Sequence, residues 1–174
     1  MMPRSIWFER KFTLDLPLLM YPNVLERVRG TPARLEDRLL KLPREVLTRR
    51  EGEDWSIQEQ AGHLLDLGAL DLGRLNDYAA GRDTLRPADL GNRKTHEANH
   101  NADSIEHILA SFRAERSEFV RRLEGFDLEL VGRATALHPR LQMPMRVIDF
   151  AYFIAEHDDH HLARISQLLR AGGA

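Results

Sequence analysis

Two histidines, His157 and His161, stand four residues apart in the segment EHDDHH at positions 156–161. On a helix, residues at this spacing lie on one face with their side chains beginning about 6 Å apart. Two imidazoles placed in this way can bind one cation at about 2.0–2.1 Å each. The other interpretation is a pair of buried rings that hydrogen-bond to a buried carboxylate, because unpaired polar groups are costly inside a protein.

The helix that carries this pair is expected to run from about residue 144 to residue 170. Its apolar side chains recur at the helical period and share one face with the two histidines. His160 lies off this face, so we expect it at the rim or exposed. The residues on the face are Val147, Phe150, Ile154, His157, His161, Ile165 and Leu168.

A third histidine, His63, lies in another predicted helix, residues 57–80. Ser56 and Glu59 have the spacing of a capping box, which starts this helix, and His63 falls at the edge of its apolar face. A single inward-facing histidine is more often a hydrogen-bonded core residue than a ligand. Three of them on two long helices indicate a metal site, because the cores of helical bundles are where facing helices build such sites.

Other polar residues could support this site. His100 lies in a predicted polar loop, residues 82–102. His138 precedes a proline in the last predicted connection, residues 126–143, where it could overhang the site. Glu59 and Asp158 lie close enough to the inner faces to orient an imidazole, although both could equally be exposed acids. Asp158, Glu59 and His100 are also the nearest candidates for proton transfer.

The chain as a whole predicts an all-α fold, a four-helix bundle with long inter-helix connections. Pro17 and Pro22 argue against a continuous helix near the start. Residues 1–21 are therefore expected to form an N-terminal arm of uncertain structure, and residues 22–174 a single helical domain. The charged run at 115–124 is interpreted as a solvated outer face. The predicted helices are residues 23–41, with a kink or restart at Thr31, then 57–80, 103–125 and 144–170.

Composition narrows the possible functions. The 174 residues contain 25 Lys and Arg against 27 Asp and Glu, so the net charge is −2. Without a basic excess we expect no nucleic-acid partner and no anionic membrane partner. There is no cysteine, and therefore no thiolate ligand or cysteine nucleophile. No signal peptide is visible in residues 1–11, so a cytoplasmic protein is expected.

Two segments of the chain resemble a known family. The sequence WSI at 55–57 followed by HLLD at 63–66, together with HDDHHLARI at 157–165, is similar to the DinB-like family, including its YfiT-type metal-binding bundles. The resemblance covers about residues 22–171. It implies a four-helix bundle, often a homodimer, with a divalent metal held by three histidines, which here are His63, His157 and His161. Arg164 is a further candidate for a residue that supports the ligands or faces the substrate at this site, and many members carry Gln or His at this position.

The function expected from these observations is that of a metal-dependent enzyme. Three imidazoles leave a coordination position open, either for water in a hydrolase or for a small-molecule thiol in a transferase. Zinc or nickel suits such ligands best, and iron or copper also fits. We expect a small-molecule substrate. The alternatives are a non-catalytic stress-response bundle that binds a metal or small molecule, and a structural bundle whose histidines are simply buried.

Overall fold

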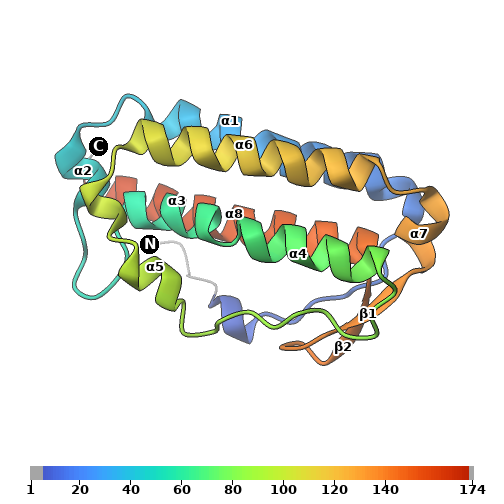
Figure 1. The fold of residues 1–174 in the computed structure, drawn as a ribbon. Coiled ribbons are helices and arrows are strands. Elements are labelled where there is room, and N and C mark those ends of the chain that lie inside the picture. The colour runs from blue at the N-terminus through green and yellow to red at the C-terminus, as the bar shows by residue number, and fades with distance from the viewer. Residues whose placement is uncertain (1–5, 173–174) are drawn as a thin grey trace.

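The computed structural model describes residues 6–172. Long helices dominate it, as predicted, and Figure 1 shows them lying side by side. The first five residues of the expected arm and the last two of the expected helical domain lie outside the described residues. The α-helices are α1 (Tyr21–Leu39), α2 (Arg44–Thr48), α3 (Ile57–Asp66), α4 (Gly68–Ala79), α5 (Arg93–Glu97), α6 (Ile105–Glu124), α7 (Leu128–Arg133) and α8 (Val147–Ala171).

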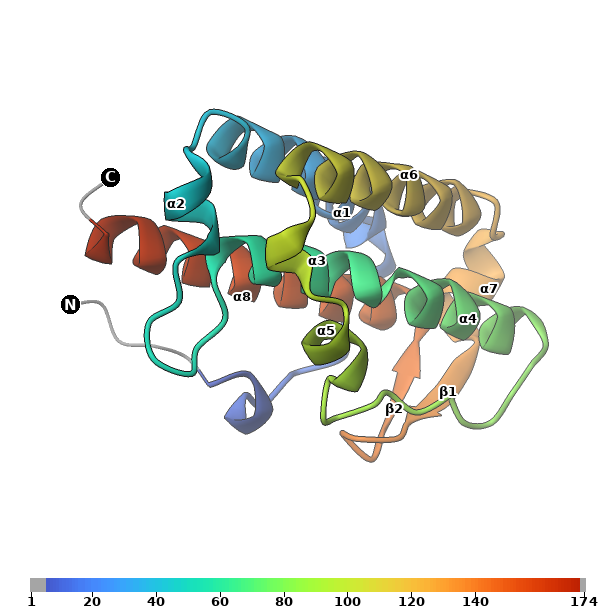
Figure 2. The same ribbon diagram turned by 60° about the vertical axis from the view of Figure 1, so that its left-hand side comes forward.

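The bundle consists of α1, the α3–α4 pair, α6 and α8. Helix α1 packs against α6 and α8, and α3 packs against the same two helices. Helices α1 and α3 therefore face each other diagonally across the bundle, although they follow one another in the sequence (Figures 1 and 2). The prediction of an all-α four-helix bundle is confirmed, and the diagonal connection shows that consecutive helices need not be neighbours.

Two predicted helices differ from the structure in their continuity. The expected helix at 57–80 begins with the predicted capping box but is divided at Leu67 into α3 and α4. Helix α4 starts at Gly68, where a Cβ atom would lie 1.4 Å from Oε2 of Glu115, so any larger residue would displace the end of that side chain on α6. Helix α1 does not restart at Thr31 but continues through Pro32. The Thr31 hydroxyl donates to the Asp158 carboxylate instead of capping a new helix.

The connection predicted at 126–143 contains structure that the sequence analysis missed. Helix α7 is followed by strands β1 (Thr135–His138) and β2 (Met143–Arg146), which pair antiparallel with Thr135 opposite Arg146. Because residues 143–146 belong to β2, the last helix begins at Val147 rather than near residue 144. The predicted loop at 82–102 contains α5 and a turn of 3-10 helix, His100–Ala102, and its residue Leu85 donates its N–H to the carbonyl of Leu137.

The hydrophobic core has two clusters, one toward each end of the bundle. One contains Val28, Leu75, Phe119 and Ile154, and the other contains Leu35, Leu64, Phe112 and Leu162. Between these positions on the four long helical segments lie buried polar residues. We call this set the polar layer, and it consists of Thr31 on α1, Asp71 on α4, Arg116 on α6 and Asp158 on α8.

The ion pair of Arg116 and Asp158 joins two helices within the polar layer, at 2.9 Å. Arg116 belongs to the charged run at 115–124 that was expected to face solvent, and for this residue the expectation is wrong, since its side chain is buried. Burial raises the pKa of Asp158, while the guanidinium of Arg116 and the hydroxyl of Thr31 oppose this shift. The layer is thus held by hydrogen bonds among α1, α6 and α8.

The described part of the N-terminal arm packs along α8. A turn of 3-10 helix, Trp7–Glu9, places Trp7 against Phe12 and Phe153, with ring centroids 5.2 Å apart in both pairs. Farther along, the N–H of Leu16 donates to Asp149 at 3.1 Å. Residues 6–20 are therefore ordered against the bundle, with short helical turns and extended segments between them.

Within residues 6–172, no helix combines the length and the apolar character needed to cross a membrane.

Candidate metal centre

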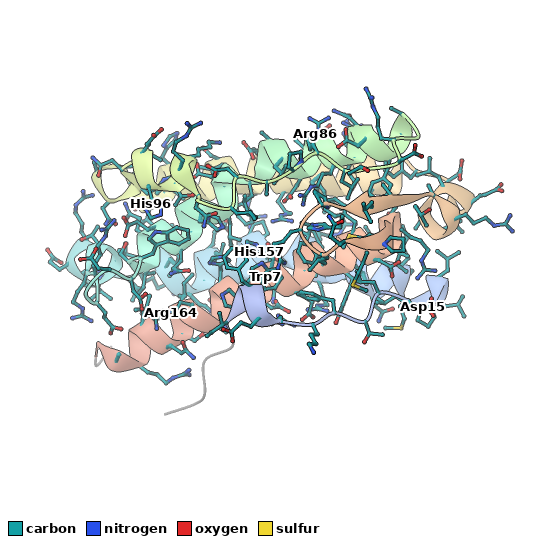
Figure 3. All side chains as sticks on the ribbon, turned by 90° about the horizontal axis from the view of Figure 1, so that it is seen from below. Trp7, Asp15, Arg86, His96, His157 and Arg164 are labelled. Carbon is teal, nitrogen blue, oxygen red and sulfur yellow. The ribbon has the colours of Figure 1, made fainter. Side chains whose placement is uncertain are left out.

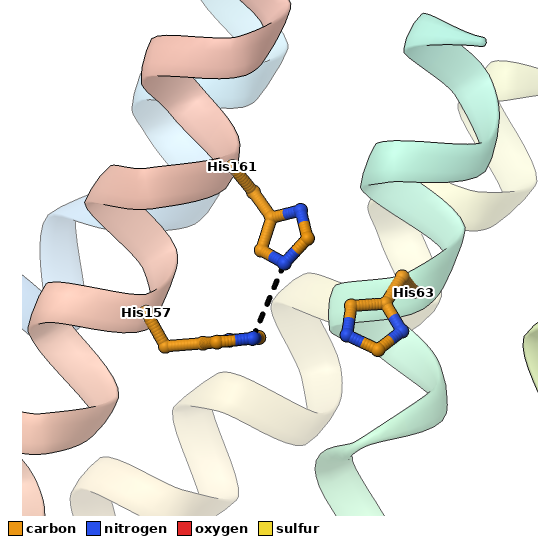
Figure 4. A group of neighbouring side chains, drawn as sticks. All are labelled: His63, His157 and His161. Atoms are coloured by element: carbon orange, nitrogen blue, oxygen red, sulfur yellow. Dashed lines mark hydrogen bonds between the residues drawn. The ribbon is translucent and has the colours of Figure 1, made fainter. Parts of the chain in front are cut away.

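Helices α3 and α8 bring the three predicted histidines together. His63 projects from α3, and His157 and His161 project from α8 (Figure 4). All three are buried, and one ligand atom from each lies within 4.8 Å of the other two. The Nε2 atoms of His157 and His161 are 3.2 Å apart. Two nitrogens bound to one tetrahedral zinc ion at about 2.0–2.1 Å would be about 3.3 Å apart, so this spacing fits a shared cation.

Gln60 orients the ring of His161. Its side-chain oxygen lies 2.7 Å from Nδ1 of His161, and an amide oxygen can only accept a hydrogen bond. The proton of the neutral ring is therefore on Nδ1, which leaves the Nε2 lone pair facing His157. Gln60 lies one turn before His63 on α3, so one helix holds both a candidate ligand and the group that orients another.

A chain of hydrogen bonds orients the ring of His63 in the same way. The Thr95 hydroxyl donates to Asp66 at 2.8 Å, so it accepts from Nδ1 of His63 at 3.0 Å. The carboxylate oxygen of Asp66 also lies 2.8 Å from Nε2 of His100. This chain keeps the proton of His63 on Nδ1 and leaves Nε2 available, which is the arrangement that histidine ligands in metal sites require.

Burial keeps the three imidazoles neutral. It lowers the pKa of His63 to about 4, and it lowers the pKa of His157 and His161 well below the ordinary value. Neighbouring histidines add to the effect for all three rings. Neutral imidazole is the form that binds a metal, so the electrostatics agree with the geometry.

The three rings border a pocket of about 320 Å³, a size suited to a small molecule. Two tryptophans form part of its wall. The ring of Trp55 lies 4.8 Å from that of His63, and the ring of Trp7 lies 4.8 Å from that of His157. Figure 3 shows Trp7 next to His157. His160 also lines the pocket and is half-buried, in agreement with its expected place at the rim.

Glu59 and Asp158 were expected to orient the histidine rings, but they do not contact them. Their carboxylate oxygens accept hydrogen bonds from other groups. Glu59 accepts from Arg50 and from the N–H of Ser56, the latter at 2.9 Å. Asp158 accepts from Thr31 and Arg116. Glu59 therefore caps α3, and Asp158 belongs to the polar layer.

The remaining three predicted residues lie at or near the site. His100 is buried and reaches His63 only through Asp66 and Thr95. His138 lines the pocket from β1, in agreement with the expected overhang. Arg164 also lines the pocket, where its guanidinium pairs with Asp54 at 2.8 Å.

Asp71 was not predicted from the sequence. This residue lines the pocket from α4 and is buried, and burial raises the pKa of its carboxyl group to about 7, although Arg116 and Arg74 oppose the shift. It lies eight residues after His63, two turns farther along the same side of the α3–α4 pair. That spacing is the signal that could have identified it.

The sequence model of the DinB superfamily matches residues 27–165. The chain belongs to the DinB superfamily. A search of curated proteins found no match.

Two solved structures share the fold of this DinB-superfamily chain. One is YfiT from Bacillus subtilis, described as a probable metal-dependent hydrolase with an unusual four-helix bundle topology. It superposes on this chain with a TM-score of 0.80 at 17% sequence identity, and the match covers 95% of this chain and 94% of YfiT. The other is the colibactin self-resistance protein ClbS, solved in complex with a dsDNA. It superposes with a TM-score of 0.67 at 15% sequence identity, and the match covers 86% of this chain and 95% of ClbS. At these identities the likeness shows the fold alone.

The complex of ClbS corrects one expectation. The charge balance of this chain suggested that a nucleic-acid partner could be excluded, but a protein of the same fold binds double-stranded DNA. Net charge is an average over the whole surface, and it does not describe any single face of the bundle. The exclusion is therefore wrong.

Proposed function

We propose that this protein is a metal-dependent hydrolase in which His63, His157 and His161 hold one divalent cation. Zinc and nickel are the metals that we expect to bind there. The observation that supports it is the convergence of three neutral imidazoles at the wall of a pocket of about 320 Å³. A divalent cation held by three imidazoles supplies a Lewis acid and lowers the pKa of water to about 7.

The residues of the chain supply the rest of the chemistry. Gln60 and Thr95 hold the rings of His161 and His63 with their Nε2 atoms directed inward. Trp7 and Trp55 pack against two of the rings and give the pocket apolar walls beside them. Asp71 lines the same pocket, and because its pKa is raised to about 7 it can both accept and donate a proton near neutral pH.

The metal part of the proposal is tested by removing metal with a chelator and titrating Zn²⁺ or Ni²⁺ back. We expect one ion per chain, and we expect His161→Ala to weaken binding at least tenfold because a third of the ligands is lost. His107→Ala is the matched control, since His107 is an exposed histidine that contacts Asp103. Equal metal binding by the two variants would overturn the assignment.

The catalytic part is tested by assaying the reconstituted protein on esters, amides and thiol-transfer substrates. Ester or amide cleavage that disappears with chelator and in His161→Ala supports the hydrolase. Thiol transfer without hydrolysis would replace it by a transferase using the same open position. Stoichiometric metal without turnover in either panel would overturn the enzyme and favour a non-catalytic binding protein.

A further inference from the structure

One end of the pocket is built by the β1–β2 hairpin, and it contains hydrogen-bond donors with nothing to donate to. His138, at the end of β1, is 2% exposed. The N–H of Leu141 donates to its Nδ1 at 3.2 Å, so the proton of the neutral ring is on Nε2. Among residues 6–172, no acceptor lies within hydrogen-bond distance of this Nε2. A buried N–H without an acceptor is costly, which indicates that a ligand supplies one.

Arg140, two residues farther along, provides a second donor of this kind. Its Nη2 atom is buried and has no hydrogen-bond partner in the described part of the chain. Aromatic rings hold the guanidinium in place, with its central carbon 5.3 Å from the ring of Phe8 and 5.9 Å from those of Trp7 and Phe153. Arg140 is half-buried, and an arginine remains charged at neutral pH, so this end of the pocket carries a positive charge that has no ion-pair partner among residues 6–172.

The acidic residues that line the pocket form no ion pair with Arg140. Asp54 pairs with Arg164, and Asp89 accepts from the backbone N–H groups of Gly91 and Arg93. Glu53 adjoins Asp54 in the sequence and lines the pocket with it. Asp71 interacts with Arg74 and Arg116. No ion pair among residues 6–172 joins one of these acids to Arg140.

The two donors lie close to the three histidines. The ring of Trp7 lies between them, because its centroid is 4.8 Å from the ring of His157 and 5.9 Å from the guanidinium carbon of Arg140. The ring of Phe153, one helical turn before His157, lies 5.0 Å from that of His138. A small molecule about as long as one aromatic ring can therefore contact the two donors and the three histidines at once.

We propose that His138 and Arg140 form a binding subsite for a carboxylate, and that the ligand is an apolar small molecule carrying one carboxylate group. Both donors border the ring of Phe153 at this end of the pocket, and two N–H donors can serve the two oxygens of a carboxylate. The aromatic rings around Arg140 and the side chains of Leu67, Leu70 and Ile154 suit an apolar body. The proposal deepens the proposed function by naming a substrate class, and it rests on that function only for what happens after binding.

The experiment compares 3-phenylpropanoate with its neutral analogue 3-phenylpropanamide on the chelator-treated full chain, by calorimetry and by the NMR shifts of the tryptophan indoles. We expect the acid to bind at least tenfold more tightly than the amide. Because Trp7 contacts Arg140 and Trp55 does not, the indole N–H of Trp7 should shift more than that of Trp55.

Variants test which residues are responsible. In Arg140→Gln the preference for the acid should fall to near one, whereas Arg140→Lys should keep part of it. Arg133→Gln, which removes an exposed arginine just before the same hairpin, is the matched control and should bind like the wild type. Thermal melts confirm that each variant is folded.

Three results would overturn the proposal. These are equal affinities of the acid and the amide for the wild type, an acid-induced shift confined to Trp55, and an unchanged preference in folded Arg140→Gln. Because the protein is free of metal, these results are independent of the proposed hydrolase. Binding of the acid without any turnover by the metal-loaded protein would contradict only the proposed hydrolase. Metal binding without binding of the acid would contradict only the proposed subsite.

Discussion

The hydroxyl of Thr95 accepts a hydrogen bond from Nδ1 of His63 across 3.0 Å. Thr95 lies on α5, a helix of five residues in the segment that the sequence predicted as a loop, and it connects a ring on α3 to the carboxylate of Asp66. Groups that hold the second nitrogen of a histidine ligand set the tautomer and the direction of the first. The contact therefore assigns an orienting role to a side chain outside the four main helices.

Replacing Thr95 by Val should weaken metal binding by about 10- to 100-fold, because the ring of His63 loses its hydrogen-bond acceptor. Valine has nearly the same size and shape as threonine, so the packing at this position is kept. Competition with a chromophoric chelator measures the change. Thr48→Val is the matched control, since its hydroxyl bonds only to the backbone of Arg44. Equal affinities for the two variants would contradict the role assigned to Thr95.

Gly62→Ala should destabilise the protein by about 1–3 kcal/mol, because an added Cβ would lie 2.3 Å from Cγ of His100 and force that ring away from α3. Gly30→Ala, in the middle of α1, should stabilise it by about 0.5–1 kcal/mol, since nothing lies within 4 Å of its Cβ. Urea unfolding measures both. A destabilised Gly30→Ala, or a Gly62→Ala equal to the wild type, would contradict the packing described.

The pH dependence of stability should reveal Asp71. Burial raises the pKa of its carboxyl group from 3.8 to about 7, so the folded chain binds a proton that the unfolded chain releases. The resulting stabilisation is complete below about pH 4 and is lost as the pH rises through about 7. Asp71→Asn has no such dependence, and its stability relative to the wild type should increase between pH 4.5 and 7.5.

Urea unfolding of the wild type and Asp71→Asn across this range measures the difference between them, in which the titration of the histidines cancels to first order. Each unit of pKa difference corresponds to about 1.4 kcal/mol. A difference that does not change with pH would show that Asp71 titrates in the folded protein as it does in the unfolded chain.

Arg116→Met should cost about 3–5 kcal/mol, because it leaves the carboxylate of Asp158 buried without its cation. Adding Asp158→Asn should recover part of the loss, since a neutral amide no longer needs that partner. A double-mutant cycle by denaturant unfolding gives the coupling energy. Strictly additive losses would show that the two side chains do not stabilise each other.

The sequence predicted the parts of the structure that depend on local spacing. The Ser56–Glu59 capping box fixed the start of α3, and the four-residue spacing of His157 and His161 placed both rings on the inner face of α8. The position of His63 on its helix was enough to bring it to the same point. These features depend on helix geometry, which residues close in the sequence determine.

Residues with distant partners could not be placed in the same way. Arg116 looks solvated in its charged run, and its burial depends on its ion pair with Asp158, 42 positions away. Strands β1 and β2 have four residues each and are stable only as a pair, so their sequences carry little signal. The hairpin in turn decides where His138 and Arg140 lie, which is why spacing alone could not predict them as a pair of donors.

The polar layer of Thr31, Asp71, Arg116 and Asp158 also determines how the helices are aligned lengthwise. If α8 slid by one turn, about 5.4 Å, Asp158 would leave Arg116 and enter apolar surroundings. The same slide would carry His157 and His161 past His63, because they occupy the same stretch of α8. Four residues outside the proposed ligand set thus make the misaligned bundles costly, and they fix the height at which the three imidazoles meet.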